Sequence, residues 1–260
     1  MPTVQAMIDK ILTAIPGAPF AETVDTIKAG DPAQEVTGVV TTFLATCEVL
    51  QQAVDAGANF IITHESPYYI HQALPAWLAD DPVYRTKWQF IADHRLVIWR
   101  FHDYWHRHQP DGILTGVAQA LGWSGYADPD RRNVFELPTM PFSDLVAQVD
   151  ERLGCRRTMT VGRPDMPCSK IALLVGFPGS EWQITALRGD VDVLVTGELH
   201  EWETSEYVRD AIYQGLSKAL IVTGHQVSEE AGMAYLVDWL RPRFPGVPIT
   251  HIPSGDPFAE

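Results

Sequence analysis

The fold is decided by short apolar stretches of one kind, of which the clearest is Asn59-Phe60-Ile61-Ile62-Thr63-His64-Glu65. Its aromatic and β-branched residues predict a short buried strand that ends at Thr63. An imidazole and a carboxylate follow the strand directly. Similar stretches recur along the chain with helical patterns between them. This alternation predicts an α/β fold with mixed, largely parallel sheets flanked by helices.

The apolar runs and helical patterns divide the chain into regular segments. We expect strands within the apolar runs at residues 36–43, 59–63, 96–101, 133–137, 170–175, 191–196, 218–223 and 248–252. Helical spacing covers residues 1–15, 47–56, 83–93, 112–121, 143–153 and 228–240. Residues 69–81, rich in aromatic residues and prolines, are expected to form a loop or short helix. The turn-rich residues 124–132 mark a boundary, so we expect residues 1–260 to form a single two-lobed domain with approximate lobes 1–127 and 128–260.

The net charge of the chain limits the classes of molecule that it can bind. The chain carries 33 acidic and 19 basic residues, a formal net charge of -14. Such a balance repels polyphosphate backbones, so we expect no sequence-independent nucleic-acid binding. It suits a protein that attracts cations, although an acidic surface also serves solubility.

The cysteines and the lengths of the apolar runs indicate the cellular compartment in which we expect the protein. Cys47, Cys155 and Cys168 are odd in number, far apart and without a C-x-x-C pair, which argues against a disulfide scaffold. The first 15 residues lack the basic-then-apolar layout of a signal peptide. No apolar run approaches the roughly 18 residues that cross a membrane. We expect a soluble, cytoplasmic protein.

Side chains that bind metals stand at the ends of four apolar runs. They are His64 with Glu65, His102 with His106, Glu198 with His200 and Glu201, and His225 with Glu229. In open α/β sheets, side chains from several strands converge beyond the carboxyl ends of the strands. We therefore expect a metal cleft between the two lobes. Its ligands would be His64, Glu65, His102, His106, His225 and Glu229.

The spacing of two pairs supports this hypothesis. His102 and His106, like His225 and Glu229, are four residues apart, which places each pair on one face of a helical turn. Imidazole nitrogen with carboxylate oxygen suits one or two divalent ions such as Zn, Fe, Mn, Ni or Co.

Each residue taken alone has a structural alternative. A single histidine after a strand is more often a hydrogen-bonded loop residue, and a His/Glu pair on a helix is usually solvated. Glu198 and Glu201 would also be favoured at a helix N-terminus. The recurrence at several strand ends favours metal binding. His71, His94, His108 and His251 do not share the pattern, and for them we expect structural roles.

Glycine motifs of other enzyme classes are missing. The sequence has no G-x-x-x-x-G-K-[ST], G-x-G-x-x-G or G-x-S-x-G pattern. The glycine cluster at residues 176–180 is interpreted as a strand-to-helix turn, with backbone amides facing a ligand as the alternative.

At these residues the chain resembles the Ngg-interacting factor three-like family, the GTP cyclohydrolase type 2 homologues. The matching segments are Ile62-Thr63-His64-Glu65-Ser66-Pro67, His102-Asp103-Tyr104-Trp105-His106, Asp192-Val193-Leu194-Val195-Thr196-Gly197-Glu198 and Gly224-His225-Gln226-Val227-Ser228-Glu229. Their order and spacing extend over nearly the whole chain, as in the short form of the family without an inserted domain.

Two positions depart from the pattern of this family. Glu65 stands where the family has a second histidine, and His106 stands where it has an aspartate. The exchange keeps four imidazoles and two carboxylates, so the total ligand charge is unchanged. Histidine cannot bridge two metal ions as aspartate can, so Glu65 or Glu229 would have to bridge, or one of the two positions would be weak or empty.

The leading functional hypothesis is a metal-dependent hydrolase of a small molecule, with Glu198 as the general base or as a residue that orients a ligand. His200 and Glu201 are weaker candidates for substrate contact. The resemblance implies a dinuclear centre, two-lobed subunits, a homo-hexamer and a GTP cyclohydrolase-like reaction. Basic residues that could offset the acidic balance for a triphosphate are Arg100, Arg107 and Arg188. The alternative is a metal-handling or regulatory interaction protein without turnover.

Overall fold

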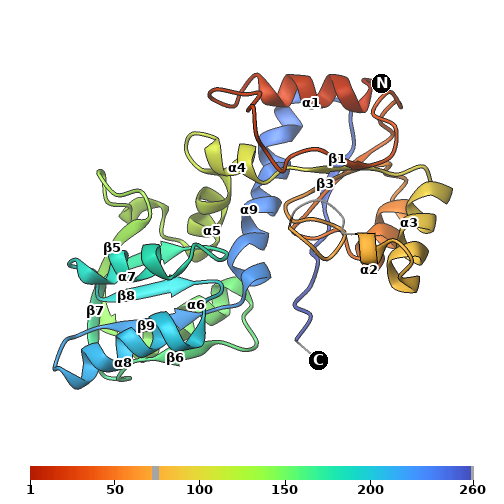
Figure 1. Ribbon diagram of the computed structural model, residues 1–260. Helices are drawn as coiled ribbons and strands as arrows, with labels where there is room; N and C mark the ends of the chain where they lie inside the picture. Colours follow the sequence, from red (N-terminus) through yellow and green to blue (C-terminus); the bar gives the residue numbers. More distant parts are fainter. Residues whose placement is uncertain (72–75, 259–260) are drawn as a thin grey trace. The chain divides into compact units, whose positions relative to one another are not determined.

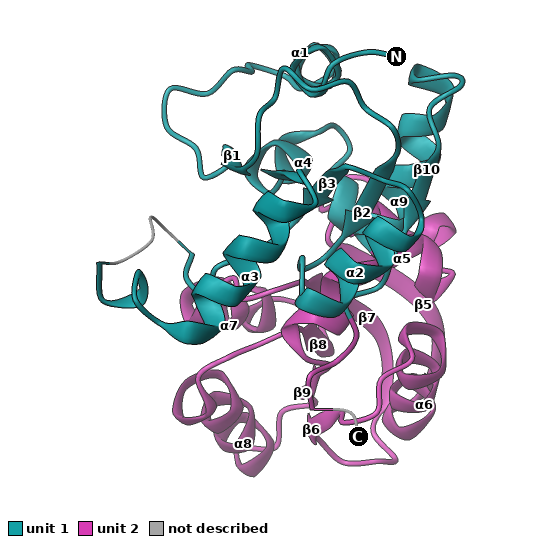
Figure 2. Cartoon of the chain, turned by 90° about the vertical axis from the view of Figure 1, so that its right-hand side faces the viewer, with its two compact units in different colours: residues 1–113, 232–254 teal, residues 114–231, 255–260 magenta. Residues whose placement is uncertain are grey.

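The chain forms two compact units (Figure 2). We describe them from a computed structural model that covers residues 1–71 and 76–258. The first unit holds residues 1–113 and 232–254, and the second holds residues 114–231 and 255–260. Each of the helices α5 (Gly112–Leu121) and α9 (His225–Leu240) begins in one unit and ends in the other.

A five-stranded sheet with the order β1-β4-β3-β2-β10 organises the first unit. Figure 1 labels its strands β1 and β3. Four of its strands are parallel: β2 (Val39–Thr42), β3 (Phe60–Thr63), β4 (Val97–Arg100) and β10 (Ile249–His251). The edge strand β1 (Ile27–Ala29) pairs antiparallel with β4. Every residue of β2, β3 and β4 is buried, as expected for parallel strands that are covered on both faces.

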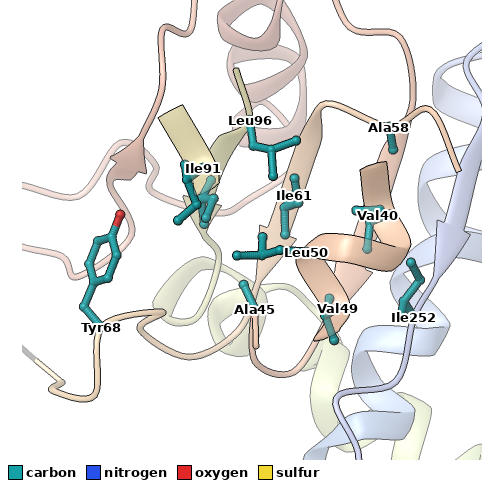
Figure 3. Packing of buried hydrophobic residues seen from close by; sticks show 12 residues of the cluster. Val40, Ala45, Val49, Leu50, Ala58, Ile61, Tyr68, Ile91, Leu96 and Ile252 are labelled. Carbon is teal, nitrogen blue, oxygen red and sulfur yellow. The ribbon is translucent and has the colours of Figure 1, made fainter. Parts of the chain in front are cut away.

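Two helices of the first unit, α2 (Cys47–Asp55) and α3 (Pro82–Asp93), pack on this sheet, and each has a polar residue as its N-cap. Thr46 caps α2, and Asp81 caps α3, which has proline in its first turn. Leu50 and Ile91 from these helices meet strand residues in one buried cluster, drawn in Figure 3. The remaining helical segments of this unit are α1 (Val4–Leu12), η1 (Ala76–Leu78), α4 (Asp103–Arg107) and η4 (Arg241–Arg243).

The second unit is built on a sheet with the order β5-β7-β8-β9-β6. Its central strands β7 (Pro167–Leu174), β8 (Val193–Thr196) and β9 (Ala219–Val222) are parallel, and its edges β5 (Val134–Pro141) and β6 (Met159–Val161) are antiparallel. The helical segments are η2 (Ser124–Tyr126), α6 (Phe142–Leu153), α7 (Ser180–Arg188), the π-helical turn η3 (Glu201–Ser205) and α8 (Glu206–Tyr213). A buried cluster that includes Leu187, Leu194 and Val208 joins the sheet to α7 and α8.

The predicted fold class is confirmed: both sheets are mixed, largely parallel and flanked by helices. The predicted strands and helices correspond to observed elements, whereas the three-residue edge strands β1 and β6 were not predicted. Within the expected loop at residues 69–81, residues 72–75 lie outside the described residues. The single two-lobed domain stays a prediction. None of the helices in the described part of the chain has the length and apolar character needed to cross a membrane.

Candidate metal centre

Three histidines meet at the carboxyl ends of β3 and β4 in the first unit. Thr63 and Arg100 face each other in the strand register, so His64 and His102 follow at neighbouring positions. Helix α4 then returns His106 to the same place. One nitrogen from each ring lies within 4.8 Å of the others. The ring of His64 is 4.5 Å from that of His102 and 5.1 Å from that of His106, measured between centroids.

A hydrogen bond fixes the tautomer of each ring. The Nδ1 atom of His64 lies 3.3 Å from the carbonyl oxygen of Phe101. The Nδ1 atoms of His102 and His106 lie 3.0 Å from carboxylate oxygens of Asp103 and Asp111. Carbonyl and carboxylate oxygens only accept, so each Nδ1 donates its proton, and in the neutral imidazole the lone pair is then on Nε2. This is the arrangement that proteins use for metal-binding histidines.

Burial keeps His64 in the form that binds metals. Its side chain is fully buried, and this burial, together with the neighbouring His102 and His106, holds the pKa of His64 well below its ordinary value. The imidazole is therefore neutral at physiological pH. The donor set of this first group, His64, His102 and His106, fits a borderline divalent ion.

Contacts with an earlier loop position helix α4. Asp25 is buried and accepts hydrogen bonds from the backbone N–H groups of His102 at 2.8 Å and Tyr104 at 2.7 Å. Burial raises the pKa of Asp25 to about 6, against the effect of these bonds. Asp103 accepts from the hydroxyl of Thr23 at 2.8 Å, so the loop is fixed on both sides of the helix start. Although burial would raise it, hydrogen bonds led by that from His102 lower the pKa of Asp103.

Glu65 is part of the same region through a buried arginine. Arg100 is fully buried, and its Nη2 donates to Oε2 of Glu65 at 2.6 Å. The other carboxylate oxygen lies 3.6 Å from Nε2 of His102. Arg100 also donates to the backbone carbonyls of His64 and His71, at 3.1 and 2.6 Å. The fixed positive charge holds Glu65 in one orientation, with a single oxygen directed at the histidines.

A cavity of about 700 Å³ opens beside the first group. Both His102 and His106 line it, as do Phe20 and Arg107. Two of the three imidazoles can therefore be reached by a small molecule, while His64 lies behind them.

A second group forms in the second unit, at the ends of β8 and β9. Thr196 and Val222 are partners in the strand register, so Glu198 and His225 follow neighbouring strands. The Nδ1 atom of His225 donates to Oε2 of Glu198 at 2.9 Å, and its Nε2 lies 3.2 Å from Oε2 of the buried Glu229. Glu198 is thus in contact with His225, and both of its predicted roles stay predictions.

Gly176 makes room for this second group (Glu198, His225 and Glu229). It has a φ of 61°, and a Cβ atom there would collide with the carboxylate of Glu229 and crowd the ring of His225. Its backbone N–H donates to the hydroxyl of Ser228 at 2.9 Å. The glycine cluster at residues 176–180 is therefore the turn between β7 and α7 and packs directly against predicted ligands.

The other histidines take different positions. His94 and His108 donate through Nδ1 to backbone carbonyls, and His251 contacts the hydroxyl of Thr41. His71, for which we expected a purely structural role, lies beside the first group: its Nδ1 accepts from Arg100 at 3.1 Å.

Sequence reasoning missed several residues that shape these groups. Asp103 and Asp111 are one and five positions from a histidine, so spacing alone could have suggested them. Asp25 acts on His102 from 77 positions away, and no local pattern signals it.

Comparison with curated proteins finds distant relatives over most of the chain. A GTP cyclohydrolase 1 type 2 homolog of Chlamydia pneumoniae is 24% identical over 242 residues, which is 89% of this chain and 90% of the relative. A protein of the same name from Escherichia coli (strain K12) is 25% identical over 215 residues, 80% of each chain.

Solved structures share the whole fold. A hypothetical protein of Staphylococcus aureus matches with a TM-score of 0.79 and 17% identity over 99% of both chains. A Bacillus cereus protein related to NIF3 matches with a TM-score of 0.78 and 17% identity, over 100% of this chain and 99% of the other. The model of the family described as Duf34/NIF3 (NGG1p interacting factor 3) matches residues 5–257. The chain therefore belongs to the Duf34/NIF3 family.

Proposed function

We propose that this protein is a metal-dependent hydrolase of a small molecule and holds one or two divalent transition-metal ions. The observation that carries the proposal is the first group. Its three imidazoles are anchored through Nδ1, and two of them line a cavity of about 700 Å³. A purely structural histidine cluster would not need three separate acceptors that all engage the same ring nitrogen, Nδ1.

Each residue has a proposed role. In the first unit, His64, His102 and His106 would hold one ion, with Glu65 adding a carboxylate oxygen. In the second unit, His225 and Glu229 are the proposed ligands. When bound, such an ion acidifies a water molecule so that hydroxide is available near neutral pH. Glu198 would keep the ring of His225 in the tautomer that leaves Nε2 unprotonated. Because the side chain of Glu198 is 56% exposed, it would also be accessible as a general base.

Among the residues that line the cavity, Arg107 is the candidate partner for an anionic group of a substrate, with Glu22 and Asp103 nearby in the same lining. Arg107 lines the cavity beside His106, whereas Arg100 is engaged by Glu65 and two carbonyls. The names of the curated relatives make GTP the first nucleotide to test. The net charge of -14 favours smaller or less charged molecules, so the screen includes esters and amides as well.

Metal content is the test. We would measure metal per chain by plasma mass spectrometry on untagged protein purified without chelators, for the wild type and the His102→Ala, His225→Ala and His94→Ala variants. We expect one to two equivalents in the wild type and in the His94→Ala control, and less in the other two variants. Substrate screens would then compare metal-free with metal-loaded protein. Equal turnover of every active substrate by both forms would contradict the proposal.

The second candidate function is reversible metal handling without turnover, which the same ligands would serve. Transfer of the ion to a competing chelator within minutes would favour it, whereas slow release would favour the hydrolase. A cytoplasmic location and a homo-oligomer, a hexamer by resemblance to the family, belong to the same proposal. Light scattering of the purified protein tests the oligomeric state.

A further inference from the structure

Three exposed rings form a cluster next to the second group. The ring of His200 lies parallel to that of Trp202, with centroids 4.9 Å apart and an interplanar angle of 7°. The ring of Phe177 lies 5.1 Å from that of His200 and is tilted by 52° to it. Trp202 is 71% and Phe177 43% exposed. We call Phe177, His200 and Trp202 the aromatic ledge.

The backbone ties this ledge to predicted metal ligands. Phe177 follows Gly176, the residue whose missing side chain makes room for Glu229 and His225. His200 is two residues after Glu198, whose backbone N–H donates to the carbonyl of Gly176 at 2.8 Å. The ledge therefore lies on two loops that meet the second group: one carries Glu198, and the other packs against His225 and Glu229 of α9.

A buried glutamine holds the loop that carries His200 and Trp202 in place. Gln183 is fully buried, and its amide nitrogen donates to the backbone carbonyl of Glu198 at 2.9 Å and to the hydroxyl of Thr196 at 3.1 Å. Its amide oxygen accepts from the buried hydroxyl of Thr204 at 2.6 Å. Thr204 lies in the π-helical turn that carries Trp202, a kind of turn that is frequent at functional sites. All groups of this amide are satisfied, so the ledge is preorganised rather than loose.

The charge around the ledge limits what it can bind. The neighbouring residues Glu198, Glu201 and Glu203 are acidic, and Glu203 accepts from Nδ1 of His200 at 3.2 Å. From residue 176 to residue 205, Arg188 is the only lysine or arginine. An anionic ring would be repelled here, whereas neutral and cationic rings are attracted to the face of an indole.

We propose that the aromatic ledge stacks on a flat heteroaromatic ring, uncharged or positively charged, that is part of the molecule bound at the second group. The inference deepens the proposed function, since it assumes that the rest of the molecule reaches His225 and Glu229. Stacking itself does not require the metal, so the two can be tested separately.

Three pyridines of one shape and different charge provide the probe. We would titrate 1-methylnicotinamide (cationic), nicotinamide (neutral) and nicotinate (anionic) by saturation-transfer NMR, with cyclohexanecarboxamide as the non-aromatic control. The proteins would be the wild type, Trp202→Leu, Trp202→Phe and Tyr213→Leu. Tyr213, 93% exposed at the end of α8, is the matched control for loss of an exposed ring in the same unit.

We expect the cationic and neutral pyridines to bind, and nicotinate and the cyclohexane to bind at least fivefold more weakly. Trp202→Leu should weaken the binding of 1-methylnicotinamide at least tenfold. Trp202→Phe should restore most of that binding, and Tyr213→Leu should leave it unchanged. Equal affinity of wild type and Trp202→Leu would overturn the proposal. So would binding of nicotinate as tight as that of the cation.

Light scattering and metal content complete the test. If Trp202→Leu breaks up an oligomer while no pyridine binds the wild type, the ledge is a contact between copies of the chain, and the proposal is wrong. Pyridine binding by a protein that retains no metal would support the ledge and contradict the proposed hydrolase. Metal binding without any pyridine binding would contradict the ledge alone.

Discussion

At the scale of single residues, the exchange of Glu65 and His106 against the family pattern has a local explanation. Each substituted residue has its own fixed partner: Arg100 holds Glu65, and Asp111 holds His106. The contact with Arg100 leaves Oε1 of Glu65 as the oxygen nearer to His102. The sequence alone left open which carboxylate could bridge two ions, and Glu65 and Glu229 both stay candidates.

The Arg100→Leu substitution should strongly destabilise the metal-free protein. It would leave the carboxylate of Glu65 and the carbonyls of His64 and His71 without their donor. Removing one partner of a buried ion pair typically costs about 3–5 kcal/mol of unfolding free energy. Urea unfolding would measure the loss, with the exposed Arg107→Leu as control. A loss no larger than in that control would show that Arg100 does not hold the site together.

The Asp111→Asn substitution should weaken metal binding without unfolding the protein. The amide no longer forces the Nδ1 atom of His106 to be the donor, so the tautomer that leaves Nε2 available is less favoured. Loss of such a partner typically lowers metal affinity about 10–100-fold. Competition with a chromophoric chelator measures the dissociation constant. The control is Asp93→Asn, on the exposed side of α3. An unchanged constant would mean that the tautomer is set by other contacts.

Lysine 87 gives a pH dependence of stability that is independent of the metal ligands. Lys87 is buried on α3 and donates to the carbonyl of Pro67 at 2.7 Å. Burial lowers its pKa from 10.5 to about 8. Between these values the unfolded chain binds more protons than the folded one, so the contribution of Lys87 to stability rises with pH through this range.

The unfolding free energy of the wild type relative to Lys87→Met should therefore rise by roughly 2–3 kcal/mol between pH 7 and pH 10. Denaturant titrations at several pH values would measure the difference. Because other groups titrate in both proteins alike, only the difference is informative. Parallel curves for the two proteins would refute the assignment.

At the scale of elements, parallel strands explain why so much of the site could be predicted. Each of β3, β4, β8 and β9 is a run of buried residues that is followed by a histidine or a glutamate. Adjacent parallel strands bring their carboxyl ends, and therefore these residues, together. The partners of the ligands could not be predicted in the same way. Asp25 and Arg100 act through long-range contacts that depend on how loops close, and their sequence neighbourhoods carry no period or motif.

Alanine substitutions at two glycines in the turn between β7 and α7 can distinguish the effect of backbone strain from that of a side-chain collision. Gly176 and Gly179 both have positive φ, but a Cβ at Gly179 has no neighbouring atom within 4 Å, whereas one at Gly176 meets Glu229. Gly179→Ala should lose about 1–3 kcal/mol of stability through strain alone, because its φ of 89° and ψ of 152° lie in a region that glycine alone adopts readily. Gly176→Ala should lose about 2 kcal/mol in addition to its own backbone strain, because a ligand has to move, and should also bind metal more weakly. Thermal unfolding and metal content would test the pair; equal effects of both substitutions would refute the crowding at Gly176.

At the scale of the whole molecule, a metal that binds only the folded chain must stabilise it. The predicted ligands span residues 64–229, so the unfolded chain cannot present them together. At a free metal concentration of about 100 times the dissociation constant, the stabilisation is about 2.7 kcal/mol, which corresponds to a rise in Tm of roughly 5–10 °C for a chain of this size.

The net charge of -14 makes a control necessary, since an acidic surface also attracts divalent cations without a specific site. His102→Ala removes an imidazole from the first group and leaves the surface carboxylates in place. We therefore expect zinc or manganese to raise the Tm of the wild type and of His94→Ala alike, and to have little effect on His102→Ala. Calorimetry at fixed ionic strength would measure the three proteins. An equal rise in all three would assign the stabilisation to the acidic surface and remove the support for a metal held by the first group.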